Sequence, residues 1–115
     1  MKELSKSIIP AFTEEQWAEV QPWLTKGDRI QPWEFLKLSQ IEGTSVLLAL
    51  FTNGLCTLRW MIYHSCQQAP VARRDYMDGF QPTPWKCQAC YLKVTAPDDL
   101  RYELEAELLH NVKLV

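Results

Sequence analysis

Near the start of the chain, apolar residues recur with the period of a helix. Trp17, Val20 and Leu24 fall at positions i, i+3 and i+7, which share one helix face. Thr13 and Gln16 have the spacing of a capping box, in which each side chain bonds the other's backbone amide. Pro22 is unfavourable inside a helix. The pattern therefore predicts a helix over about 14–23.

From residue 33 to 63 the pattern favours strands. Cys56, Leu58, Trp60 and Ile62 alternate with more polar residues, which predicts a strand over 55–63. Asn53-Gly54 is typical of a two-residue hairpin turn, so a partner strand is expected over 45–52. A turn at Glu42-Gly43 then predicts a further strand over 33–41. A helix over 45–51 is the alternative, because Leu-Leu-Ala-Leu also favours helices.

The last third of the chain begins with a long loop over 67–84 that contains Pro70, Pro82 and Pro84. A strand is expected over 85–94. After it, Pro97 is suited to a first helical turn, and leucines repeat every four residues from Leu100. This repeat predicts a second helix over 97–111.

These elements predict an α+β fold. We expect a small antiparallel sheet, a meander of three strands plus one, with an N-terminal helix and a C-terminal helix. The length of 115 residues is typical of one domain, so residues 1–115 are predicted to form a single domain.

Charge and hydropathy narrow the classes of function. Asp and Glu outnumber Lys and Arg by 14 to 12, whereas nucleic-acid binding usually shows as a basic surplus, so a nucleic-acid partner is not expected. The longest apolar run, 46–51, is far shorter than the ~20 residues of a membrane span. No secretory signal pattern precedes it. We therefore expect a soluble cytoplasmic protein with reduced cysteines and no membrane association.

The strongest candidate for chemistry is a set of four metal-ligating side chains: His64, Cys66, Cys87 and Cys90. Cys-x-x-Cys places two thiolates on one tight turn, and a Cys₃His set can hold zinc. However, His-x-Cys is a poor second pair, and a 115-residue chain does not need a metal to fold. Buried reduced thiols and a satisfied histidine are therefore favoured over zinc, and we expect no cofactor and no bound metal in most purified molecules. Thiol redox chemistry is a weaker alternative, because strand-like residues follow the motif rather than a helix.

No catalytic motif is evident, and four glycines leave no Gly-rich phosphate loop. The sequence favours a non-enzymatic intracellular binding or regulatory module that acts through a protein partner. Aromatic and Arg side chains dominate binding hot spots. The candidate surface residues of this kind are Tyr76, Phe80, Trp85, Arg59, Tyr63, Arg73 and Arg74. The alternatives are a zinc-stapled adaptor for protein or nucleic acid, and a small thiol-dependent redox protein. The oligomeric state is left open.

Overall fold

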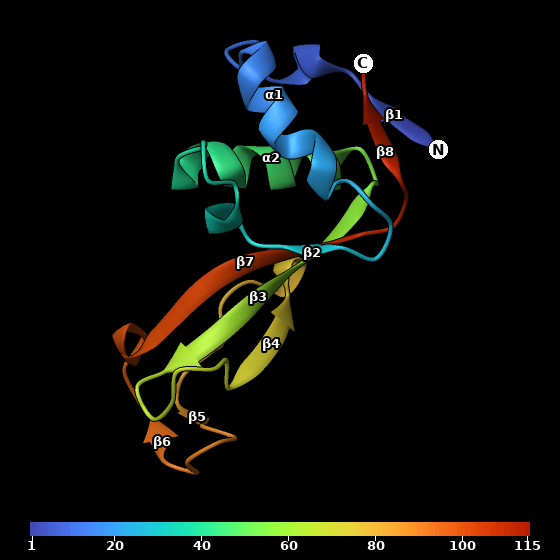
Figure 1. The fold of residues 1–115 in the computed structure, drawn as a ribbon. Coiled ribbons are helices and arrows are strands. Elements are labelled where there is room, and N and C mark those ends of the chain that lie inside the picture. The colour runs from blue at the N-terminus through green and yellow to red at the C-terminus, as the bar shows by residue number, and fades with distance from the viewer. The chain divides into compact units, whose positions relative to one another are not determined.

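The computed structural model describes every residue from Met1 to Val115, and its elements are labelled in Figure 1. The chain forms two compact units. Unit 1 contains Met1–Leu58 and Glu105–Val115, and unit 2 contains Arg59–Leu104. The mixed α+β class is confirmed, but the predicted order of elements is wrong in its middle and at its C-terminal end. The single domain stays a prediction.

The first helix of unit 1 forms where the sequence predicted it. After a short 3₁₀ turn η1 (Lys6–Ile8), helix α1 (Glu14–Val20) begins, and a 3₁₀ turn η2 (Gln21–Trp23) continues it. Both hydrogen bonds of the predicted Thr13–Gln16 capping box are present.

The second helix contradicts the predicted strands over 33–41 and 45–52. A 3₁₀ turn η3 (Pro32–Glu34) is followed by helix α2 (Gln40–Thr52), as the alternative over 45–51 proposed. Ser39 caps this helix by accepting a hydrogen bond from the amide of Glu42, so Glu42 begins a helix and does not turn a hairpin.

Asn53 and Gly54 end α2 and do not close a hairpin, so that prediction is also wrong. Gly54 has φ +71°, a left-handed conformation that suits both the end of a helix and a tight turn. The Asn53-Gly54 dipeptide is therefore compatible with a helix end as well as with a hairpin turn. Strand β3 (Cys56–His64) begins two residues later, which confirms the strand predicted over 55–63.

The C-terminal part of the chain is made of strands and not of a helix. The predicted helix over 97–111 is wrong: a 3₁₀ turn η5 (Pro97–Asp99) leads into strand β7 (Leu100–Leu108). Strand β2 (Arg29–Ile30) pairs antiparallel with the end of β7. Strand β1 (Lys2–Leu4) pairs in parallel with β8 (Val112–Leu114).

Unit 2 is a small β structure. Strand β3 pairs antiparallel with β4 (Ala72–Asp75), which continues into a 3₁₀ turn η4 (Tyr76–Asp78). The predicted strand over 85–94 is interrupted: β5 (Trp85–Lys86) and β6 (Lys93–Val94) form a separate antiparallel hairpin. Hydrogen bonds order the larger sheet as β2-β7-β3-β4.

The two units differ in how much apolar surface they bury. Of the 22 buried hydrophobic side chains, only six belong to unit 2: Met61, Ile62, Cys87, Val94, Leu100 and Leu104. A segment with so small a core usually needs a disulfide, a metal or a partner to be stable. None of the helices has the length and apolar character needed to cross a membrane.

Candidate metal centre

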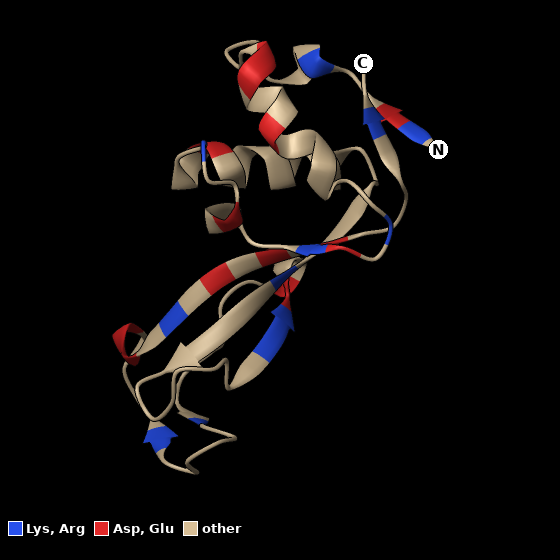
Figure 2. Ribbon diagram, in the orientation of Figure 1, with Lys and Arg blue, Asp and Glu red and all other residues tan.

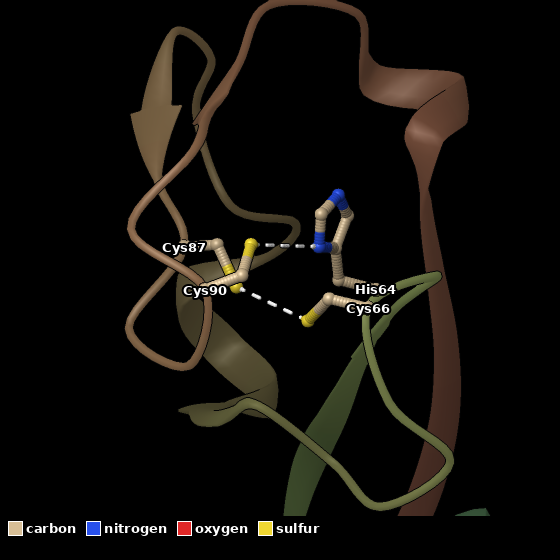
Figure 3. Close-up of side chains that lie close together, drawn as sticks. All are labelled: His64, Cys66, Cys87 and Cys90. Carbon is tan, nitrogen blue, oxygen red and sulfur yellow. Dashed lines mark hydrogen bonds between the residues drawn. The ribbon is translucent and has the colours of Figure 1, made fainter.

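Four side chains of unit 2 that were singled out in the sequence converge on one point (Figure 3). His64 lies at the end of β3, and Cys66 follows it in the next turn. Cys87 and Cys90 lie in the turn that joins β5 to β6. One potential ligand atom from each residue lies within 4.8 Å of the other three, although the two pairs are separated by more than 20 residues of chain.

The distances between these atoms suit a tetrahedral zinc ion. Zn–S bonds of about 2.3 Å and Zn–N bonds of about 2.0 Å imply S···S edges of about 3.8 Å and S···N edges of about 3.5 Å. The sulfurs of Cys66 and Cys87 lie 3.8 Å apart, and the Cys90 sulfur lies 3.6 Å from His64 Nδ1. The remaining pairs, at up to 4.8 Å, need to contract by about 1 Å to reach the same edges. The donor set and its geometry therefore fit zinc.

The turn around Cys87 has the backbone of a thiolate-binding loop. The Cys87 amide donates to Leu92 O, and the Tyr91 amide donates to Cys87 O, both at 2.9 Å. Burial raises the pKa of Cys87. Hydrogen bonds to its sulfur, from the backbone amides of Cys90 and Ala89 and from the side chains of Cys90 and Cys66, together outweigh burial and lower the pKa to about 7. This turn is therefore organised to hold a thiolate, which is the form that binds metals.

The pKa of the Cys66 thiol is shifted in the opposite direction. Desolvation raises the pKa of Cys66 to about 11, and its neighbours Cys87 and Cys90 add to the shift through hydrogen bonds and charge repulsion. Three thiolates this close together repel each other unless a cation lies among them. The cluster is thus suited to hold either shared protons or a metal cation.

The cysteine turn also belongs to the core of unit 2. Cys87 is fully buried in a cluster with Ile62, Val94 and Leu100, and Cys90 packs against that cluster. The interpretation as small buried thiols therefore describes Cys87 well. It does not describe Cys66, which is exposed.

Two of the predicted binding residues, Tyr76 and Phe80, meet at a third ring. Their ring centroids lie 5.6 Å and 5.1 Å from that of Trp60. Together with Met77 and Gly79, these side chains line a pocket of about 330 Å³. Sequence analysis missed Trp60 because the alternation along β3 assigned it to the core, whereas it is only half-buried.

The other predicted binding residues are dispersed. Arg74 is near the aromatic pocket and donates to Gly79 O at 3.0 Å. Arg73 is exposed on β4 opposite Met61, and Arg59 lies opposite Asp75. The two remaining residues are Tyr63, which lies under the guanidinium of Arg101, and Trp85, which lines a different pocket on the β5–β6 hairpin.

Compared with known proteins, this chain matches no family model, no curated protein and no solved structure.

Proposed function

We propose that this chain is a non-enzymatic intracellular adaptor in which a structural zinc ion, held by His64, Cys66, Cys87 and Cys90, stabilises unit 2. The observation that carries the proposal is the convergence of four ligand atoms within 4.8 Å of one another. Zinc bound by four protein side chains has no open position for water or substrate, which is the mark of a structural site.

The small core of unit 2 supports this proposal. Cys-x-x-Cys on the β5–β6 turn and His-x-Cys at the end of β3 belong to segments that a metal would tie together. A 115-residue chain with an ordinary core does not need a metal to fold. Unit 2, however, holds only six of the 22 buried hydrophobic side chains, so a metal would add substantially to its stability.

Elemental analysis tests the proposal directly. Protein purified without added metal and without chelator is expected to contain close to one zinc per chain. Cys87→Ser should lose the metal, because the ligand with the best-organised thiolate is removed. Cys56→Ser is the matched control, since Cys56 is buried in unit 1 and is not part of the cluster. Absence of metal from the wild type, or iron in place of zinc, would overturn the proposal.

A second observation favours protein binding as the adaptor's activity. The pocket lined by Trp60, Tyr76 and Phe80 is open to solvent, and Phe80 is 62% exposed. Its rim is held in place by polar contacts: Arg74 donates to Asp78 O and Gly79 O, and the Asp75 carboxylate accepts from the Met77 amide. A preorganised aromatic pocket is suited to an apolar side chain of a protein partner, because little order is lost on binding.

Selection of displayed peptides tests this activity. Peptides that bind the wild type are expected to share an apolar anchor and to lose binding to Phe80→Asp. Leu36→Asp is the matched control, because Leu36 is an exposed apolar residue of unit 1. Peptides that bind both variants equally would show that the aromatic pocket is not the docking site.

A further inference from the structure

The hairpin that carries the cysteine turn also carries a pair of like charges. Lys86 of β5 lies directly opposite Lys93 of β6, and both are exposed. Directly opposite residues of an antiparallel pair project from the same face, and like charges there are destabilising. No Asp or Glu occurs between Asp78 and Asp98, and Figure 2 shows blue and no red on this hairpin. The unfavourable pair therefore has no carboxylate neighbour along the chain.

Tyr91, in the same hairpin, has an unfavourable backbone conformation. Its φ of +64° is the left-handed conformation, in which a bulky side chain costs about 1–2 kcal/mol and glycine is preferred. Core packing does not repay this cost, since Tyr91 is 71% exposed. The Lys86 ammonium lies 5.5 Å from the centroid of the ring. A strained backbone that carries an exposed side chain is a feature of many functional sites.

These side chains surround a pocket of about 230 Å³. It is lined by Pro84, Trp85, Lys86, Tyr91 and Lys93. Two lysines and two aromatic residues thus border one concavity. A ligand that carries both negative charge and flat aromatic groups would relieve the lysine repulsion and cover the exposed ring.

We infer that the β5–β6 hairpin binds single-stranded nucleic acid, with backbone phosphates at Lys86 and Lys93 and a base stacked on Tyr91. Single-strand binding typically combines basic groups that follow the backbone with aromatic side chains on which bases stack. This inference goes beyond the proposed structural zinc and rests on different side chains.

The acidic composition of the whole chain does not argue against this surface. Unit 2 contains six Lys and Arg and five Asp and Glu, so the acidic excess lies in unit 1. A zinc ion with three thiolates and a neutral imidazole carries one negative charge, which the two lysines of the hairpin exceed. The net charge of the whole chain, which disfavoured a nucleic-acid partner, does not represent the charge of unit 2.

Fluorescence anisotropy with a short labelled single strand tests the inference. The wild type is expected to bind with a dissociation constant between about 1 µM and 0.1 mM, and to bind more weakly as salt is raised from about 50 to 200 mM. Lys86→Gln with Lys93→Gln should reduce the slope of log K against log salt by about 1.4, because two phosphate contacts are lost. Lys26→Gln with Lys37→Gln is the matched control, as both are exposed lysines of unit 1.

Substitutions of Tyr91 test the stacking contact. Tyr91→Phe keeps the ring and should leave affinity unchanged. Tyr91→Gly relieves the backbone and should preserve the fold, yet weaken binding by about fivefold to a hundredfold. Equal affinity of the Gly and Phe variants would show that no base stacks there.

Three further results would overturn the inference: no binding at about 0.1 mM protein in low salt, equal losses in the two lysine double variants, or binding to anionic vesicles instead of the oligonucleotide. Zinc is measured in the same preparations. A zinc-loaded protein that does not bind the strand refutes only this inference, and a strand-binding protein without zinc refutes only the structural metal.

Discussion

The amide of Leu55 donates a hydrogen bond to the carbonyl oxygen of Leu50, 3.0 Å away across the end of α2. The Gly54 amide donates to Phe51 O at the same time, also at 3.0 Å. This pair of bonds is a Schellman motif, which requires a left-handed residue directly after the helix cap. Gly54, with φ +71°, supplies it.

Gly54→Val should therefore lower the free energy of unfolding by about 1–3 kcal/mol, because a β-branched residue is strained at positive φ. A Cβ at this position would meet no atom within 4 Å, so the loss comes from the backbone conformation and not from crowding. Urea denaturation measures it. Gly54→Asn should cost much less, since Asn tolerates this conformation. Equal losses for Val and Asn would contradict the assignment.

Substitution of Gly43 should destabilise the fold through crowding and not through backbone strain. A Cβ there would lie 2.5 Å from Pro32 O in η3. Gly43→Ala should destabilise by about 1–3 kcal/mol through overpacking, even though alanine favours helices by up to about 1 kcal/mol. Thr44→Ala, in the same turn of α2, is the control. An increase in stability for Gly43→Ala would mean that α2 and η3 do not approach so closely.

Ala106 distinguishes the observed strand from the predicted helix. In β7 it is fully buried, on the same face as Leu104 and Leu108. Ala106→Glu should cost about 3–5 kcal/mol, because it leaves an unpaired charge in the core. Glu107→Ala, which breaks the surface ion pair with Arg29, should cost no more than about 1 kcal/mol. Thermal unfolding of both variants gives the comparison, and a well-tolerated Ala106→Glu would favour the helix.

Cys56 should be unreactive in the native protein. Burial raises its pKa to about 12, so roughly one molecule in ten thousand carries the thiolate at pH 8. Alkylation followed by peptide mapping should label Cys56 only after unfolding. Because its folded pKa lies above the unfolded value of about 8.5, Cys56 stabilises the fold at neutral pH, and this contribution is lost as the pH rises above 8.5 toward 12. Rapid native labelling at pH 8 would contradict the burial.

Metal removal should affect the two units differently. After chelation, backbone amides of the β5–β6 hairpin should exchange with solvent faster, because the proposed zinc no longer holds the cysteine turn. Amides of α2, which lies in unit 1, should keep their protection. Hydrogen exchange measured by mass spectrometry reports both in one experiment. Uniform loss of protection, or no change in the hairpin, would show that the metal does not act locally.

The parts of the fold that could be predicted are those with a clear local signal. Helix α1 had a capping box and an apolar face, and β3 had apolar residues at every second position. The spacing of four between Leu100, Leu104 and Leu108 was ambiguous, because positions four apart share a face in a helix and also in a strand. Ala106, midway between two of these leucines, was the overlooked sign of a period of two.

The residues of the candidate metal centre could be predicted from the sequence, but their convergence in space could not. Spacing alone identified the four possible ligands, yet it gave no means of knowing that they converge. That convergence depends on the return of the chain from β3 to the β5–β6 hairpin, a tertiary feature. In the aromatic cluster, Tyr76 was predicted but Trp60 was not. The reason is the same, since these two rings meet only when β4 pairs with β3.

The parallel pairing of β1 with β8 has a consequence for biosynthesis. Strand β1 leaves the ribosome more than 100 residues before its partner strand β8. Unit 2, in contrast, is one uninterrupted stretch of chain and is fully synthesised before β8 exists. Because domains fold as units during synthesis, we expect unit 2 to fold before β8 is available. Until then, Lys2–Leu4 has an unpaired strand edge. Such an edge can pair with other chains, so stalled or truncated products that lack β8 should be especially prone to aggregation.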